Sequence, residues 1–177
     1  GILLLVLSLI CILLWGKINV SDYKAVSYVR RYPEYKLDYY SYSPVGEIHV
    51  YSSSYFHFAP GLSDNASSEL DRMPAKAFKG LFIDGGGPIG IMRKLNREEA
   101  AYIDYLPATA PYLLLKKPKV LLLGLGGGAG VFTALHHNAD RVTAVESNPE
   151  IIRLLSEVPV ITEFNGNLLK DTMIEVK

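Results

Sequence analysis

A glycine-rich turn between residues 119 and 130 constrains the fold of this chain more than any other feature. Apolar residues at 120–123 lead into glycines at 124, 126, 127, 128 and 130, and residues 131–137 have the composition of a helix. This order predicts a buried strand, a tight turn and a helix. Gly124, Gly126 and Ala129 fit a pattern in which missing side chains let the backbone turn sharply and approach a ligand at a helix N-terminus. A purely structural glycine turn is the alternative.

An acidic residue follows at the distance that a nucleoside-binding fold requires. Residues 141–145 predict a second strand, which ends on Glu146, 22 residues beyond Gly124. A carboxylate in this place can accept hydrogen bonds from the two hydroxyls of a ribose. The turn and Glu146 together therefore predict a site for a nucleoside-type ligand.

The composition argues against several classes of site. Eighteen basic and eighteen acidic residues give a formal net charge of zero, and the basic residues are scattered, so we expect no nucleic-acid partner. The single cysteine, Cys11, permits neither an intrachain disulfide nor a thiolate metal cluster. No nucleophile-elbow, phosphate-loop or zinc-helix motif is present, and the histidines are interpreted as structural, so we expect no metal. Because the sequence starts on Gly1 and stops within a predicted strand, we expect a fragment of a longer protein.

The N-terminal region predicts a membrane helix. Residues 2–15 are apolar apart from Ser8 and Cys11, and at helical rise they span about 21 Å, against a hydrocarbon core of roughly 30 Å. A signal-peptide core and a buried helix are the alternatives, but the run has no basic start, cleavage site or polar face. We therefore expect a truncated transmembrane helix at 1–20. Trp15 and the basic residues after it place the soluble part in the cytoplasm, at the inner or plasma membrane.

Residues 21–95 predict a small antiparallel β-domain. Its β-forming segments are 35–42, 47–51, 55–58 and 77–83, with turn signals at 43–46 and 84–88 and a polar loop at 61–72. Most of the tyrosines lie here and are interpreted as half-buried strand residues.

Residues 96–177 predict the first half of a doubly wound domain. Asn96 caps a helix at 97–106, which Pro107 interrupts. After the glycine turn and the second strand, Ser147 or Asn148 caps a helix at 150–157, and residues 171–176 predict a third strand. Alternating strands and helices of this kind are typical of a parallel α/β sheet.

Four segments resemble the spermidine synthase (polyamine aminopropyltransferase) family, and in particular its bacterial membrane-attached members. Residues 43–50 are similar to an early hairpin of that family, 81–85 to a Leu-x-Leu-Asp-Gly strand end, 98–106 to a tyrosine-containing helix, and 120–137 to the glycine turn and its helix. The resemblance covers about residues 39–177. It implies a fold class of α/β: a truncated Rossmann-like sheet of the S-adenosylmethionine-dependent methyltransferase type, preceded by a small antiparallel β-domain and an N-terminal transmembrane helix.

The resemblance implies binding of decarboxylated S-adenosylmethionine as co-substrate. Gly124, Gly126 and Gly128 would form the turn against this ligand, and Glu146 would hold the ribose hydroxyls. Tyr102 and Asp104 are the candidates for the substrate side of the site. The resemblance places the catalytic aspartate beyond Lys177, so no catalytic residue is assigned here.

Three positions depart from the family pattern: Gly127 replaces an aspartate that faces the aminopropyl amine, Ile103 replaces a polar residue, and Ala108 replaces a histidine. The expected activity is transfer of an aminopropyl group to a small-molecule amine in polyamine biosynthesis. An S-adenosylmethionine-dependent methyltransferase and a non-catalytic nucleoside-sensing or scaffold domain are the alternatives. A homodimer, with the β-domain as lid or dimer element, is one expected arrangement.

Overall fold

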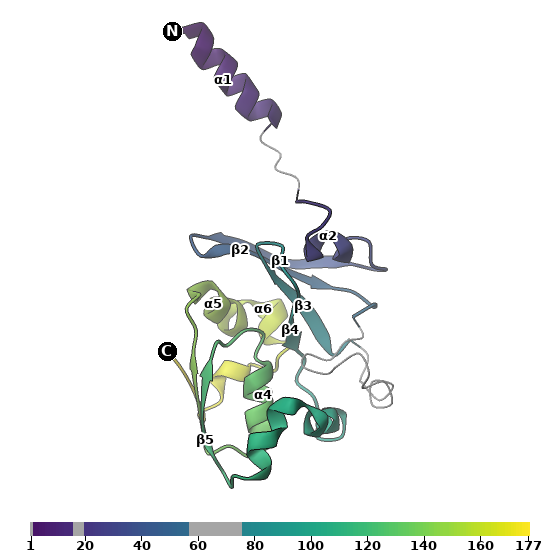
Figure 1. Cartoon of the computed structure of the whole chain (residues 1–177), viewed down its shortest axis with the longest axis vertical. Helices are drawn as coiled ribbons and strands as arrows, with labels where there is room; N and C mark the ends of the chain where they lie inside the picture. Colours follow the sequence, from purple (N-terminus) through teal and green to yellow (C-terminus); the bar gives the residue numbers. More distant parts are fainter. Residues whose placement is uncertain (1, 16–19, 57–75) are drawn as a thin grey trace.

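The computed structural model describes residues 2–15, 20–56 and 76–177 (Figure 1). The chain begins with α1 (Ile2–Trp15), α2 (Ala25–Val29) and four strands, β1 (Lys36–Ser43), β2 (Gly46–Ser52), β3 (Phe78–Ile83) and β4 (Ile89–Met92). The 3₁₀ helices η1 (Glu99–Tyr105) and η2 (Pro107–Leu113) follow. The chain then forms β5 (Lys119–Leu123), α4 (Ala129–His136), β6 (Arg141–Val145), α5 (Pro149–Glu157), α6 (Pro159–Thr162), η3 (Leu168–Lys170) and β7 (Ile174–Val176).

The first sheet is antiparallel, in the order β1-β2-β3-β4. The predicted strands at 35–42, 47–51 and 77–83 are confirmed within one residue or so at each end, whereas β4 was not predicted. The strand predicted at 55–58 is wrong where the structure describes it, because Tyr55 belongs to a turn, in which the Ser53 hydroxyl accepts a hydrogen bond from the Tyr55 amide, and Phe56 directly follows this turn. Residues 57 and 58 and the predicted loop at 61–72 lie outside the described residues.

The second sheet is parallel, in the order β5-β6-β7. Lys119 is paired with Arg141, and Val142 with Ile174, so the three strands run in register in the same direction. The prediction of a parallel α/β sheet in this part of the chain is thereby confirmed. The predicted cap of α5 is also confirmed, because the Asn148 side chain accepts a hydrogen bond from the Glu150 amide at 3.1 Å.

Both sheets contribute to one hydrophobic core. Ile48 and Leu81 of the first sheet are fully buried in the same cluster as Val142 of the second and Leu154 of α5. The core therefore crosses the boundary expected between residues 95 and 96. In Figure 1 the helices α4, α5 and α6 lie close to both sheets.

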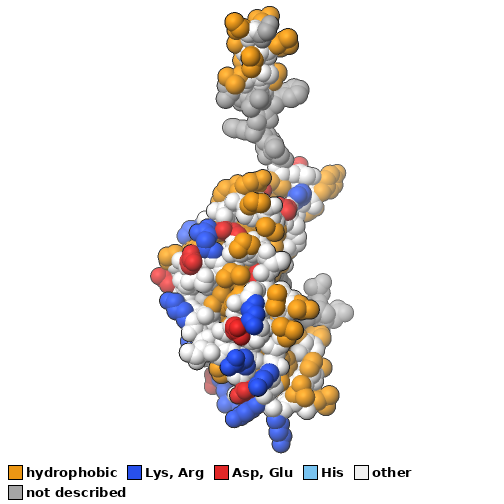
Figure 2. All heavy atoms as spheres, turned by 90° about the vertical axis from the view of Figure 1, so that its left-hand side faces the viewer, with side chains coloured by type: hydrophobic (Ala, Val, Ile, Leu, Met, Phe, Trp, Pro, Cys, Tyr) orange, Lys and Arg blue, Asp and Glu red, His pale blue; other side chains and the backbone are white. Residues whose placement is uncertain are grey.

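The parallel sheet is covered on one side only among the described residues. Val142 and Ala144 face the core and are fully buried, while Leu121 and Leu123 of β5 are 63% and 84% exposed. Strand side chains alternate between the two faces, which explains why neighbouring apolar residues differ so much in exposure. On the face shown in Figure 2, apolar side chains reach the surface in several groups between basic and acidic ones.

The predicted transmembrane helix at 1–20 is corrected by the structure. In the parts of the chain that are described, no helix combines the length and the apolar character needed to cross a membrane. Helix α1 has 14 residues, and a rise of about 1.5 Å per residue leaves it well short of a hydrocarbon core of about 30 Å. The expected membrane location and the cytoplasmic placement were both inferred from this span, and they are withdrawn together with it.

Candidate functional site

The glycine turn lies between the end of β5 and the start of α4. Its backbone is held by hydrogen bonds from the Gly124 amide to the Val145 carbonyl at 2.8 Å and from the Gly128 amide to the Leu125 carbonyl at 3.0 Å. Gly124, Gly126 and Gly128 have φ angles of +92°, +52° and +87°. Residues with side chains rarely adopt this left-handed region, so the three glycines singled out in the sequence are those that the turn requires.

Gly127 is required for a different reason, which is close packing against β4. A Cβ atom at this position would come within 2.5 Å of the Gly90 carbonyl carbon and 2.8 Å of the Ile91 amide nitrogen, and closer still to the Gly90 carbonyl oxygen. Carbon atoms in ordinary contact lie about 3.5–4.0 Å apart. The side of Gly127 that would carry a side chain therefore faces β4, and an aspartate does not fit there in this conformation.

Glu146, directly after β6, joins the glycine turn to the loop that precedes α5. Its Oε2 atom accepts hydrogen bonds from the amides of Leu125 at 2.9 Å and Gly126 at 3.3 Å, and Oε1 accepts one from the Asn148 amide at 2.9 Å. A carboxylate offers about four acceptor positions. Three are filled by the backbone, so Oε1 retains room for one further donor.

The carboxyl ends of β5 and β6 and the start of α4 form a corner, called the nucleoside corner below, whose chemistry suits a polar, uncharged ligand group. The carboxyl ends of β5 and β6 are adjacent because the strands are parallel and paired in register. Ligands of open α/β sheets bind outside these strand ends, next to a helix N-terminus. The corner presents the start of α4, a backbone free of side chains, and one acceptor position of a half-buried carboxylate, which can accept a hydrogen bond from a hydroxyl.

A second charged group fixes α5 beside this corner. Glu150 binds Arg153 through hydrogen bonds of 2.6 and 3.0 Å, and it also accepts a hydrogen bond from the hydroxyl of Tyr39 on β1. The Arg153 guanidinium, followed by the Tyr39 hydroxyl, lowers the pKa of Glu150 to about 2 against the cost of its burial. This network ties the antiparallel sheet to the helix that follows Glu146.

The two substrate-side candidates, Tyr102 and Asp104, lie in different surroundings. Tyr102 is buried, with its hydroxyl 3.7 Å from the Met92 sulfur and its ring edge-on to Phe78. Burial raises the pKa of Tyr102 far above its usual range, so its hydroxyl stays protonated. Asp104 lies at the opposite end of α4 from the turn, where its Oδ1 atom is 2.9 Å from Nε2 of His136.

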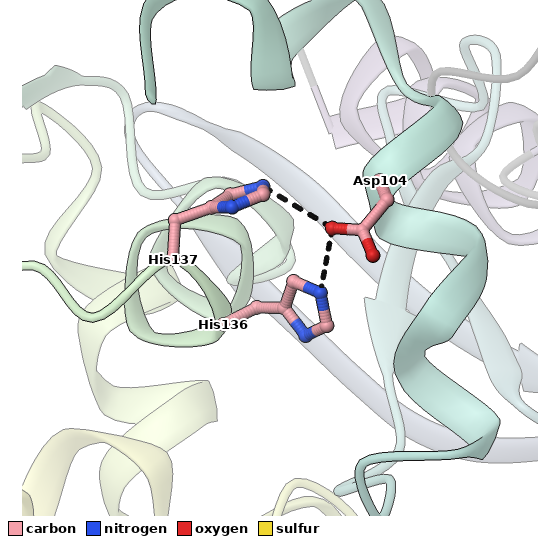
Figure 3. Close-up of side chains that lie close together, drawn as sticks. All are labelled: Asp104, His136 and His137. Carbon is pink, nitrogen blue, oxygen red and sulfur yellow. Dashed lines mark hydrogen bonds and ion pairs between the residues drawn. The ribbon is translucent and has the colours of Figure 1, made fainter. Parts of the chain in front are cut away.

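The structure brings Asp104 together with two histidines that the sequence suggested were merely structural. His136 is the last residue of α4 and His137 follows it, and both rings lie toward the same carboxylate oxygen of Asp104 (Figure 3). His137 also contacts the Thr109 hydroxyl at 3.0 Å. Burial, and then the neighbouring His136, lower the pKa of His137, which favours a neutral ring. In the sequence, only the two adjacent histidines hinted at this cluster, because their acidic partner comes from a distant segment, η1.

Comparisons with known proteins give a likeness of structure only. No protein-family model matches the chain, and no curated protein matches it. Among solved structures it is similar to a spermidine synthase in complex with the transition-state analogue AdoDATO and to a spermidine synthase from Thermotoga maritima. Each comparison has 17% identity and a TM-score of 0.47 over 80% of this chain. The chain spans 40% and 39% of their lengths. At this level no residue role is transferred, and we base the function on this chain's own geometry.

Proposed function

We propose that this chain supplies the nucleoside-binding part of a transferase that uses an S-adenosyl-type ligand. The observation that supports this most directly is the position of Glu146, whose carboxylate lies on the glycine turn with one acceptor position left on Oε1. A ribose hydroxyl is a donor of the right kind for that position. A Cβ atom at Gly124 would meet nothing within 4 Å, so the backbone there is open to a ligand, whereas Gly126 and Gly128 stand close to Ile89 and Leu168.

The activity we propose for the whole protein is transfer of an aminopropyl group from decarboxylated S-adenosylmethionine to an amine in polyamine biosynthesis. In this reaction the acceptor nitrogen attacks the carbon next to the sulfonium, the carbon–sulfur bond breaks, and the thioether leaves. The amine then loses a proton to a base. The part played by the described residues is to hold the nucleoside so that this carbon is in line with the acceptor.

The packing of Gly127 favours a second candidate, an S-adenosylmethionine-dependent methyltransferase. No side chain fits at this position against Gly90, so no carboxylate can face the amine end of the ligand from there. A ligand that retains its own carboxylate would therefore meet no like charge from residue 127. The two candidates differ in which form of the ligand binds better.

Isothermal titration calorimetry on the full chain separates these candidates. The ligands are S-adenosylmethionine, its decarboxylated form and methylthioadenosine. Tighter binding of the decarboxylated form supports aminopropyl transfer, and tighter binding of the carboxylated form supports methyl transfer. If none of the three binds, the nucleoside site itself is refuted.

The role of Glu146 is tested by Glu146→Gln, with Glu163→Gln on the exposed end of α6 as control. Lost hydrogen bonds to a charged group cost about 1.5–3 kcal/mol, so we expect the variant to bind the favoured nucleoside roughly 10- to 150-fold more weakly. Because Glu146 also holds three backbone amides, circular dichroism must show that the variant is folded. A folded variant with unchanged affinity contradicts the ribose role.

A further inference from the structure

Three side chains with metal-ligating atoms converge at the end of α4 that is remote from the glycine turn. The ligand atoms of Asp104, His136 and His137 all lie within 4.8 Å of one another. Oδ1 of Asp104 is 2.9 Å from Nε2 of His136 and 3.9 Å from Nε2 of His137. Figure 3 shows both rings directed at the same carboxylate oxygen of Asp104, which comes from η1.

These distances are close to those that a tetrahedral cation imposes. Zinc binds imidazole nitrogen and carboxylate oxygen at about 2.0–2.2 Å, which places neighbouring ligand atoms roughly 3.3–3.6 Å apart. The two measured separations from Asp104 lie on either side of this range. The third separation, between the two histidine nitrogens, lies within 4.8 Å, so rotation of the side chains would bring the three atoms onto one ion.

The surroundings hold the rings in place. The ring of His137 is stacked on Tyr112 with centroids 4.9 Å apart and an interplanar angle of 18°. The Thr109 hydroxyl donates to the Ile103 carbonyl at 2.6 Å, so it accepts from Nε2 of His137. A cation on Nε2 replaces the proton, which moves to Nδ1 of the same neutral ring, so the hydrogen bond to Thr109 is lost and the stacking on Tyr112 continues to hold the ring.

The cluster opens onto a cavity of about 690 Å³. Asp104, His136 and His137 all line it, together with Arg97 and Asn138. The two histidine side chains are only 15% and 14% exposed, whereas that of Asp104 is 56% exposed. A fourth coordination position directed at the cavity would be accessible to water or to a small anion, as in zinc sites with three protein ligands.

We propose that Asp104, His136 and His137 form a divalent transition-metal site of the zinc class, with its fourth position open to this cavity. Two neutral imidazoles and one carboxylate carry a net charge of −1, which suits a divalent cation, and nitrogen and oxygen donors suit zinc better than calcium or magnesium. The site is separate from the nucleoside corner, because α4 has eight residues, or about 12 Å of helix.

The test is zinc binding to the metal-stripped full chain, measured by competition with a chromophoric chelator. The sequence has four histidines, His49, His57, His136 and His137, which provides a matched control. We expect one zinc ion per chain, retained by His49→Gln/His57→Gln and bound at least about tenfold more weakly by His136→Gln/His137→Gln or by Asp104→Asn. Equal affinity in the two double variants, or no stoichiometric binding to the unmodified chain, overturns the proposal.

X-ray absorption of the zinc-loaded unmodified chain keeps the proposal testable if a variant does not fold. The expected first shell contains only nitrogen and oxygen at about 2.0–2.2 Å, with the outer-shell scattering of two imidazoles. A shell without imidazole refutes the site. Neither result depends on nucleoside binding, so failure of this proposal and failure of the proposed function are distinguishable.

Discussion

Replacement of Gly127 by alanine tests whether this residue is fixed by packing on β4. The added Cβ atom would lie 2.5 Å from the Gly90 carbonyl carbon and 2.8 Å from the Ile91 amide nitrogen. Since ordinary contacts between carbon atoms are about 3.5–4.0 Å, relief requires the turn or the strand to move by roughly 1 Å. Both are backbone, so no side-chain rotation can absorb the clash.

We expect Gly127→Ala to lower the free energy of unfolding by about 3 kcal/mol, the upper end of the usual cost of overpacking. With a urea dependence of about 2 kcal/mol per molar, the unfolding midpoint falls by roughly 1.5 M. The measurement is urea unfolding followed by circular dichroism. Gly87→Ala is the control, because its Cβ atom would meet nothing within 4 Å, and we expect less than about 0.5 kcal/mol there.

A midpoint for Gly127→Ala equal to that of Gly87→Ala would refute the packing argument. It would mean that the turn stands further from β4 than the structure has it. Gly127 would then be free to face a ligand, and an aspartate at this position would become compatible with the fold.

The remaining predictions concern charges and a helix cap. The pKa of Glu150 is lowered from 4.5 to about 2, so its stabilisation is complete above about pH 5 and is lost as the pH falls toward 2. Because Arg153 is half exposed, we expect Glu150→Gln to lower the free energy of unfolding by about 1 kcal/mol at pH 7 and by almost nothing at pH 2. Urea unfolding at both pH values measures the difference. Lys79→Met removes the amine that lies 2.5 Å from the buried Asp38 carboxylate. It should lower the free energy of unfolding by about 3 kcal/mol, and an unchanged urea midpoint would contradict this. Asn148→Ala should cost about 1 kcal/mol, with Asn148→Ser as the control that keeps a capping oxygen.

The parallel half of the fold was predictable because its signals are local. The bounds of β6, the cap at Asn148 and the turn after β5 each depend on residues a few positions apart. Glu146 was also found correctly beside the turn, since strand ends in a parallel sheet share an edge. Its three bonds to backbone amides were not predicted, because they depend on the path of two loops.

Strand β4 was missed because its evidence is not local. It has four residues, Ile89–Met92, and includes Gly90, which in a single sequence suggests an interruption. In the structure this glycine lies against Gly127, which comes 37 positions later in the sequence. The predicted helix at 97–106 is instead the 3₁₀ helix η1, and η2 follows it with Pro107 at its start and Pro111 inside it.

The partners of Asp104 could not be predicted from the residues around it in the sequence. The helix pattern around it resembles that of a substrate-binding helix, and this placed Asp104 on the substrate side. Its contacts come from His136 and His137, 32 and 33 residues away, at the C-terminal end of α4. The same short helix thus presents the glycine turn and Glu146 at one end and three potential metal ligands at the other. Because about 12 Å separates the two ends, variants at Asp104 and the two histidines leave the residues of the glycine turn in place, so the cavity that Asp104 lines can be tested separately from the nucleoside site.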